Sequence, residues 1–298
     1  MGKELAHKYP VARQTFAEAD AALGFSLSQL CFEGPEDNLK LTELTQPAIL
    51  TVSVAAQRVL AESGVRPQYV AGHSLGEYSA HVAAGTLTFA DAVRTVNKRG
   101  KYMQEAVPVG VGAMAAVLAL PLDQLSQACT QAAQETGQTV APANINSPDQ
   151  IVISGNKAAV ERAAELAKEK GAKRAVMLAV SAPFHCALMQ PAQDRLAVDL
   201  RALNFARPGV PVVTNVDAEL VQSADRAREA LIRQVTGAVQ WVRSVQALIA
   251  AGVERFVEVG PGKVLTGLLR QIDRSQTGLK ENEDSLQKAL AAMVAAGS

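Results

Sequence analysis

The sequence predicts an α/β protein in which a large domain with a parallel sheet is interrupted by a smaller inserted domain. The chain has 298 residues, of which 48% are hydrophobic and 19% charged, as in folded proteins that form one large domain or two ordinary ones. Strand-like and helix-like segments alternate along much of this length, which favours parallel β-α-β packing. Residues 109–179 follow a different order of strands and helices, which indicates that they form the smaller inserted domain.

The first part of the large domain, residues 1–108, is predicted to be helical around one short strand. A glycine commonly ends a helix, and Gly85 follows one of the apolar-periodic segments. The hydroxyl of Thr88 stands where it would cap the next helix. The expected elements are helices at 49–60, 77–84 and 89–106 and a strand at 69–72.

The inserted domain is predicted to have the order β-α-β-β-α-β. The expected strands are 113–120, 139–146, 150–156 and 174–180, and the expected helices are 123–134 and 158–170. Turn residues fall between these elements, as at Pro148 and Gly171. This order is typical of a ferredoxin-like domain. We therefore expect a small domain at 109–179 and a large domain formed by 1–108 and 180–298.

The alternation of the large domain resumes after the insertion. Strands are expected at 211–216 and 255–260, and helices at 239–252 and 262–272. Their order predicts parallel β-α-β packing. Residues 273–298 begin polar and become rich in alanine, which predicts a surface tail helix.

Charge and composition exclude several function classes. Basic and acidic side chains number 29 each, so no overall positive field would gather nucleic acid or anionic lipid. Cys31, Cys129 and Cys186 show neither metal-binding nor disulfide spacing, which favours a reducing compartment and no metal. The longest apolar stretch, around 114–122, is far shorter than the roughly 20 residues of a membrane span. We expect a cytoplasmic protein that binds neither nucleic acid nor membranes.

A candidate nucleophile lies in the segment Gly72-His73-Ser74-Leu75-Gly76, which matches G-x-S-x-G. The motif stands between a predicted strand and a predicted helix, which is the context of a nucleophile elbow and favours an α/β-hydrolase-like large domain. The positive end of the following helix would favour negative charge developing beside Ser74. An ordinary tight turn with a capping serine is the alternative interpretation.

A serine hydroxyl needs a neighbouring base, and the chain has four histidines. His73 is adjacent to Ser74 but should point away from it in a tight elbow, His81 lies inside a predicted helix, and His7 lies in a charged N-terminal segment. His185 stands where the inserted domain returns to the large one, so it is the candidate base. A buried structural histidine is the alternative.

Four segments together indicate a family: GHSLGEYSA (72–80), RGKYMQEAVP (99–108), SAPFHCALM (181–189) and EVGPGKVLTGL (258–268). In order and spacing they resemble the malonyl-CoA:acyl carrier protein transacylases, and the similarity runs through nearly all of the chain. The resemblance implies fatty acid biosynthesis, malonyl-CoA as substrate and acyl carrier protein as partner. It also implies that no cofactor is bound, apart from the coenzyme A thioester of the substrate. We expect a monomer.

The resemblance also implies roles for individual residues. Ser74 would be the acyl-accepting nucleophile, His185 its general base, and Arg99 the partner of the free malonyl carboxylate. A guanidinium binds a carboxylate through two parallel hydrogen bonds, which suits that role. Without the resemblance, Arg99 would be interpreted as a solvated charge on a helix. Gln234 would help to hold the histidine loop, and the backbone N–H of Leu75 would form half of an oxyanion hole.

Two residues bear on the choice of acyl group. Leu75 and Phe184 are similar to the residues of malonyl-selective members, and a bulky Phe leaves little room for an extra methyl group, a discrimination of about 1–3 kcal/mol. No carboxylate is evidently placed to complete a triad, so the resemblance implies a Ser-His dyad whose histidine is oriented by backbone carbonyl groups. Cys186, beside His185, is expected to be a small buried residue.

The start of the chain departs from the family pattern. Members normally begin with an apolar strand and a Gly-Gln-Gly-Ser-Gln loop that supplies the second oxyanion donor, whereas MGKELAHKYP matches the family segment located just after that loop. Losing one such donor typically costs about 100- to 1000-fold in turnover. We hypothesise a shortened start; an impaired protein is the alternative.

Two other functions stay open. An α/β-hydrolase-type esterase or thioesterase shares the elbow, but it also needs an HGGG-type loop and an acid between the serine and the histidine, and neither is apparent. A catalytically impaired module that only binds carrier protein is suggested by the missing oxyanion loop.

Overall fold

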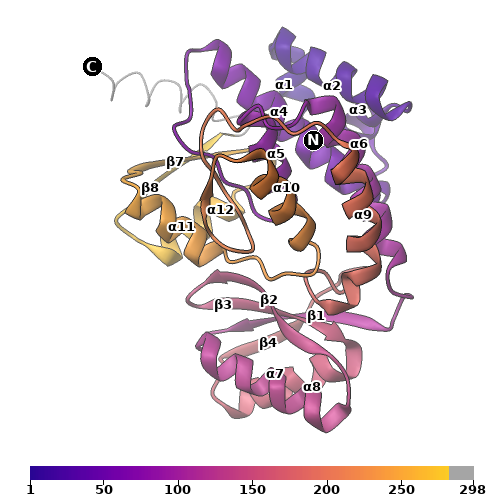
Figure 1. The fold of residues 1–298 in the computed structure, drawn as a ribbon, viewed down its shortest axis with the longest axis vertical. Helices are drawn as coiled ribbons and strands as arrows, with labels where there is room; N and C mark the ends of the chain where they lie inside the picture. The colour runs from indigo at the N-terminus through magenta and orange to yellow at the C-terminus, as the bar shows by residue number, and fades with distance from the viewer. Residues whose placement is uncertain (282–298) are drawn as a thin grey trace.

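The computed structural model describes residues 1–281 and shows two lobes (Figure 1). A small lobe, residues 112–177, lies below a large lobe that contains both the N-terminal helices and the C-terminal segments. Most of the tail helix expected at 273–298 falls on 282–298, outside the described residues. Within residues 1–281, no helix has the length and apolar character that crossing a membrane requires.

The N-terminal part of the large lobe is a group of helices packed on one long central helix. They are α1 (Lys3–Lys8), α2 (Pro10–Leu23), α3 (Leu27–Glu33), α4 (Thr42–Glu62), α5 (Gly76–Ala83) and α6 (Phe89–Glu105), with a 3₁₀ turn at Asn38–Lys40. Helix α4 packs against both α2 and α6 and buries Leu50, Val54 and Val59 among others, as a helix that is largely apolar must. At the start of α6, the predicted cap is present: the Thr88 hydroxyl accepts a hydrogen bond from Asp91 N.

The small lobe is a four-stranded antiparallel sheet with two helices. Its elements are β1 (Gly112–Leu118), α7 (Leu122–Thr136), β2 (Val140–Ser147), β3 (Gln150–Asn156), α8 (Lys157–Glu169) and β4 (Arg174–Met177). The strands lie in the order β2-β3-β1-β4, and each neighbouring pair is antiparallel. Strands and helices follow one another as predicted, although β4 ends at Met177 rather than at residue 180.

Alternate residues of the small sheet face two different cores. Ala115 and Val117 of β1 lie in a cluster with residues of α7 and α8, whereas Met114 lies in a separate cluster with Val152 of β3. Phe184 of the large lobe packs against this second cluster. The sheet is therefore sandwiched between its own helices and the large lobe.

The parallel sheet expected in the large lobe is present only as short pairings among the described residues. Val70 forms a single parallel bridge with Val212, β5 (Val212–Val213) pairs antiparallel with β6 (Leu220–Val221), and β7 (Arg255–Val259) pairs in parallel with β8 (Thr277–Glu281). The prediction of a tail from residue 273 onward is therefore wrong for β8. The backbone groups of β7 need partners, and β8 supplies them, although its sequence TGLKE lacks the apolar alternation that signals a strand.

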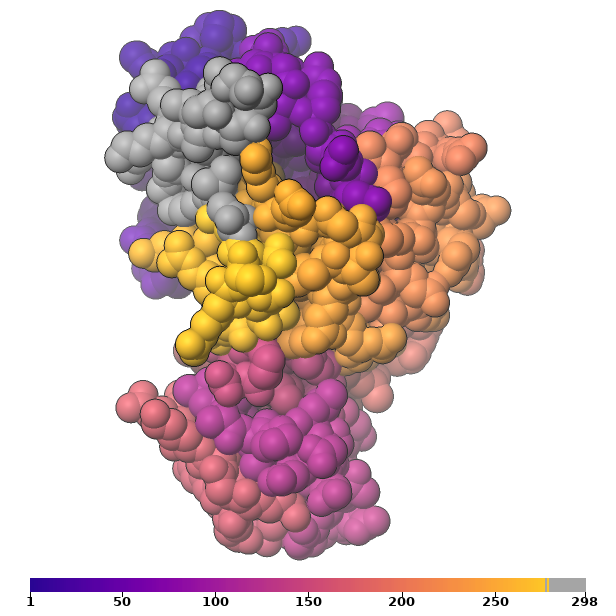
Figure 2. Space-filling view, turned by 90° about the vertical axis from the view of Figure 1, so that its left-hand side faces the viewer, coloured from indigo at the N-terminus to yellow at the C-terminus, as the bar shows by residue number. Residues whose placement is uncertain are grey.

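The large lobe meets the small lobe mainly through two of its C-terminal helices, α11 (Trp241–Ala250) and α12 (Val264–Ile272), which both contact β2. The other two C-terminal helices, α9 (Gln190–Ala202) and α10 (Ala224–Arg233), pack against each other within the large lobe, and a 3₁₀ turn at Ala187–Met189 precedes α9. Ile145 N of β2 donates to Val239 O at 2.9 Å, and the Ser147 hydroxyl donates to Gln271 Oε1 at 2.7 Å. Figure 2 shows the orange and yellow C-terminal segments seated directly on the magenta small lobe.

Candidate active site

Ser74 occupies a sharp turn between the bridge at Val70 and helix α5. Its backbone has a φ of 51°, in the left-handed region that residues other than glycine rarely adopt. The turn brings the two glycines of the motif together: a Cβ atom on Gly72 would lie 2.0 Å from the Gly76 carbonyl. Asn215 holds both sides of the turn, because its Oδ1 accepts from Ser74 N at 2.6 Å and its Nδ2 donates to Gly72 O at 2.7 Å. The motif therefore forms a tight elbow.

The structure brings Ser74 and His185 together from positions far apart in the sequence. The Ser74 hydroxyl lies 2.7 Å from His185 Nε2, and His185 Nδ1 lies 2.9 Å from the carbonyl oxygen of Gln234. Because a carbonyl can only accept, Nδ1 carries the proton and Nε2 is free to accept one from Ser74. The arrangement is a dyad whose histidine is oriented by a backbone carbonyl.

The electrostatic surroundings keep His185 neutral. Burial, followed by the positive charge of Arg99, lowers the pKa of His185 to about 3. A neutral imidazole is the form that can take a proton from a serine hydroxyl. His185 also has a positive φ, 58°, so both Ser74 and His185 adopt the left-handed backbone conformation.

Arg99 of α6 lies beside the pair and is buried, which rules out the solvated helix charge that was the alternative interpretation. Its Nη2 donates to the Ser74 hydroxyl at 3.1 Å and to Gln234 Oε1 at 2.9 Å, and its Nη1 donates to Gln46 Oε1 at 2.7 Å. None of its partners within residues 1–281 is a carboxylate. A buried cation of this kind is suited to an external carboxylate.

The other predicted site residues surround this group. Leu75 is buried at the start of α5, and in the part of the chain described its N–H donates to no other group. Gln234 is buried and follows α10. Phe184 is half-buried where the two lobes meet, directly before His185.

Among the described residues, the remaining histidines and the neighbouring cysteine make no hydrogen bond to Ser74. His73 Nε2 lies 2.8 Å from Asn146 Oδ1 of β2, which links the elbow to the small lobe. His81 is fully buried in α5, where burial lowers its pKa to about 3. Cys186 is buried and donates to Pro183 O, and burial raises the pKa of its thiol. His7 lies in α1.

The matching family model describes an acyl transferase domain and covers residues 1–293. The malonyl CoA-acyl carrier protein transacylase of Escherichia coli (strain K12) is 53% identical over 287 residues, which cover 96% of this chain and 92% of that protein. The protein of the same name from Bacillus subtilis (strain 168) is 50% identical over 274 residues, which cover 92% and 86%. The chain belongs to the acyl transferase family and, within it, to the malonyl-CoA:acyl carrier protein transacylases.

Solved structures of this family have the same fold. The transacylase from Coxiella burnetii matches with a TM-score of 0.94 at 45% identity, covering 98% of this chain and 92% of that one. A malonyl-transacylase in complex with a type II polyketide-synthase acyl carrier protein matches with a TM-score of 0.95 at 49% identity, covering 98% and 94%.

Three residues of the site were missed by sequence reasoning. Gln46 of α4 holds Arg99, Asn215 holds the elbow, and Glu77 of α5 accepts hydrogen bonds from Gln234 Nε2 and from Asn215 N. Only Glu77 lies near the motif in the sequence, where a carboxylate in the first turn of a helix is an ordinary feature. Gln46 and Asn215 carried no local signal, because their partners are contributed by distant segments.

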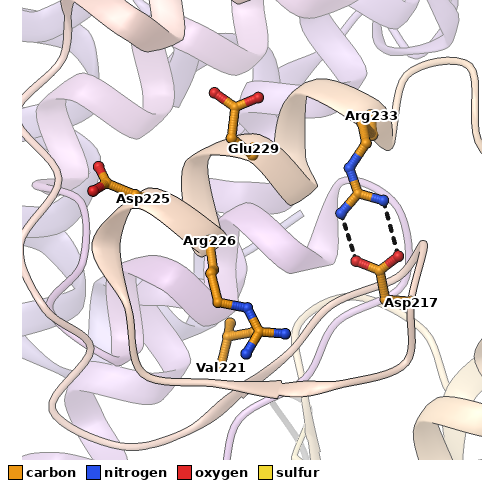
Figure 3. A pocket seen from close by; sticks show the side chains of 6 residues that line it. All are labelled: Asp217, Val221, Asp225, Arg226, Glu229 and Arg233. Atoms are coloured by element: carbon orange, nitrogen blue, oxygen red, sulfur yellow. Dashed lines mark hydrogen bonds and ion pairs between the residues drawn. The ribbon is translucent and has the colours of Figure 1, made fainter.

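A pocket of about 240 Å³ is lined by none of the predicted site residues (Figure 3). In this pocket Arg233 donates to both carboxylate oxygens of Asp217, at 2.9 and 2.5 Å, so the charges of these two side chains are paired with each other. Its lining residues are Asp217, Val221, Asp225, Arg226, Glu229 and Arg233. Among residues 1–281, no group of three or more His, Cys, Asp or Glu side chains is arranged to hold a metal ion.

Proposed function

We propose that the protein transfers the malonyl group of malonyl-CoA to the phosphopantetheine thiol of acyl carrier protein, for fatty acid biosynthesis, through a malonyl ester on Ser74. The observation that carries the proposal is the 2.7 Å contact between Ser74 Oγ and His185 Nε2, with the Arg99 guanidinium also bonded to Ser74 Oγ. The family assignment and the relatives' names support both the donor and the acceptor.

The first half-reaction forms the ester. His185 Nε2 takes the proton of Ser74 Oγ while the oxygen attacks the thioester carbonyl carbon. The carbonyl oxygen becomes an oxyanion, for which the Leu75 N–H is available at the positive end of α5. The C–S bond then breaks, and the sulfur of coenzyme A leaves as a thiol with the proton from His185.

The second half-reaction reverses these steps. The carrier-protein thiol gives its proton to His185, and its sulfur attacks the ester carbonyl. Ser74 Oγ leaves and recovers the proton. The protein is thus restored, and no group other than its own side chains is required to move the proton.

Arg99 connects recognition of the acyl group with the strength of the base. The carboxylate of the malonyl group would pair with the guanidinium and compensate its charge. That charge is one cause of the low pKa of His185, after burial, so its compensation raises the pKa of His185 when a malonyl group is bound. An acyl group without a carboxylate would leave the imidazole the weaker base.

We also propose the finer description of the fold and its setting. Residues 109–179 are a ferredoxin-like domain inserted into an α/β-hydrolase-like domain formed by 1–108 and 180–298. The antiparallel order β2-β3-β1-β4 supports the first, and the elbow before α5 supports the second. The protein is proposed to act in the cytoplasm without a bound cofactor.

The test is incubation with malonyl-CoA labelled in its malonyl group, followed by peptide mapping. We expect a labelled ester on Ser74, its loss in Ser74→Ala, and transfer of the label to phosphopantetheinylated carrier protein. Release of free malonate in place of transfer would indicate the esterase alternative. Carrier-protein binding without any labelled ester would indicate the non-catalytic alternative.

A further inference from the structure

Glu77 is a fully buried carboxylate next to the nucleophile that the transfer steps do not use. It lies in the first turn of α5, three residues after Ser74. Its Oε2 accepts hydrogen bonds from Gln234 Nε2 at 2.7 Å and from Asn215 N at 3.1 Å. A buried carboxylate is costly unless its acceptors are used, so its position calls for an explanation.

One of these contacts decides which way the Gln234 amide points. The amide oxygen accepts from Arg99 Nη2 at 2.9 Å, while the amide nitrogen donates both to Glu77 Oε2 and to Ser74 O, the latter at 2.9 Å. A flipped amide would set its NH₂ group against the guanidinium and its oxygen against two acceptors. Glu77 and Arg99 thus hold the amide from opposite ends.

The orientation matters because Gln234 contacts each of the three groups of the reaction. Its backbone carbonyl accepts from His185 Nδ1, its amide nitrogen holds the Ser74 carbonyl, and its amide oxygen holds Arg99. The second donor to Glu77, Asn215 N, belongs to the residue whose side chain pins the elbow. A single carboxylate oxygen therefore ties together the two segments that fix the nucleophile.

The other carboxylate oxygen is not part of this arrangement. Glu77 Oε1 has no hydrogen-bond partner among the described residues and lies 4.0 Å from His81 Nε2. Burial raises the pKa of Glu77 to about 7, against the opposing effect of its hydrogen bonds. A proton taken up near neutral pH can reside on Oε1, so Oε2 remains an acceptor in both states.

We propose that Glu77 is a positioning residue for the transfer reaction: through Oε2 it fixes the Gln234 amide and the Asn215 backbone, and thereby aligns Ser74, His185 and Arg99. The inference rests on the proposed function for the identity of the acyl group. It requires an acceptor at the Oε2 position and does not require a negative charge.

The experiment compares Glu77→Gln, Glu77→Leu and Glu77→Asp with the native chain. Glutamine keeps an acceptor at the Oε2 position, leucine removes it, and aspartate withdraws it by one methylene group. His81→Leu is the matched control, because it removes another buried polar side chain one turn further along the same helix. Each variant is first treated with a fluorophosphonate probe, which reacts with an activated serine hydroxyl. The final extent of labelling gives the fraction of molecules whose Ser74 can react, and the rate of labelling in that fraction reports how well Ser74 and His185 are aligned.

Malonyl transfer is then measured per labelled site. We expect Glu77→Leu to lower the labelling rate and kcat per site by about 100-fold, as for a misplaced reactive group, and to raise KM for malonyl-CoA because Arg99 is also released. Glu77→Gln and His81→Leu should stay within about threefold of native. A purely structural role would reduce the number of labelled sites and leave kcat and KM per site unchanged.

Native rates per site in Glu77→Leu would overturn the proposal, and so would a Glu77→Gln variant as slow as Glu77→Leu. If the leucine variant does not fold, Glu77→Asp decides: we expect it to be slow per site, and a native rate would overturn the proposal. A native chain that reacts with the fluorophosphonate but transfers no malonyl group refutes the proposed function alone. In that case the labelling rates still decide the role of Glu77.

Discussion

Replacing Arg99 tests how the site recognises its acyl group. Arg99→Ala removes a buried cation whose described partners are the neutral oxygens of Gln46, Gln234 and Ser74. A malonyl carboxylate would then enter a buried site without a counter-charge, and removing one partner of a buried ion pair costs about 3–5 kcal/mol. At 1.4 kcal/mol for each factor of ten, we expect kcat/KM for malonyl-CoA to fall by about 100- to 4000-fold.

The effect on stability should be much smaller. The substitution leaves the amide oxygens of Gln46 and Gln234 without a donor, which costs about 1–3 kcal/mol for each oxygen. It also removes the desolvation cost of the guanidinium, which acts in the opposite direction. Because these contributions oppose each other, we expect the thermal midpoint to change by only about a few degrees.

The assay follows label transfer to carrier protein from malonyl-CoA and, in parallel, from acetyl-CoA, which has no free carboxylate. Acetyl transfer should fall by less than about tenfold in Arg99→Ala. Arg99→Lys keeps the charge but not the planar fork, so its loss should be intermediate. Lys98→Ala is the control, since Lys98 lies on the same helix but pairs with Asp199 at the surface. Equal losses with the two substrates would refute a role for Arg99 in recognising the carboxylate.

The same contacts lead to three further predictions. Phe184→Ala should lower the ratio of kcat/KM for malonyl-CoA to kcat/KM for methylmalonyl-CoA, by an amount that corresponds to about 1–3 kcal/mol. An unchanged ratio would show that Phe184 does not line the acyl pocket. Burial lowers the pKa of His81 and of His185 to about 3, below their unfolded value of 6.5. Between these two pH values the unfolded chain binds more protons than the folded chain, so the free energy of unfolding falls as the pH drops from 6.5 toward 3. His81→Leu should reduce that loss by up to about 1.4 kcal/mol per pH unit in urea titrations, and an equal acid sensitivity would contradict this account. Asp217→Asn should cost less than about 1 kcal/mol in the free energy of unfolding, because the Arg233 side chain is 53% and the Asp217 side chain 34% exposed to solvent. A larger loss in urea titrations would show that the pair does more than an ordinary surface ion pair.

Much of the small lobe could be predicted from the sequence because its signals are local. Short apolar runs place β1 and β3, helical spacing places α7 and α8, and turn residues separate them. The large lobe was harder to predict. Its parallel pairings join segments distant in sequence, such as Val70 with Val212, and β8 has almost no apolar pattern of its own.

The residues of the candidate site also divide into those with a local sequence signal and those without one. Ser74 could be found from its motif, and His185 from the choice among four histidines together with a family resemblance. Glu77, Asn215 and Gln46 could not, because each acts through hydrogen bonds to groups that only the tertiary fold brings near. Polar residues of this kind have no periodic pattern, and their burial is what reveals them.

The two residues proposed to react, Ser74 and His185, violate the local rules that make prediction possible. Ser74 and His185 both have positive φ, a strain of about 1–3 kcal/mol for each residue. Hydrogen bonds with Asn215 and Gln234 hold these two positions: Asn215 Oδ1 accepts from Ser74 N, Gln234 O accepts from His185 Nδ1, and Gln234 Nε2 donates to Ser74 O. A typical net hydrogen bond contributes about 1 kcal/mol. Strain and restraint are therefore of similar size, so that losing a single anchor is enough to let the elbow or the histidine loop relax. This near balance is the physical reason why we expect Glu77, through its hydrogen bonds to Gln234 and Asn215, to affect the alignment of the pair.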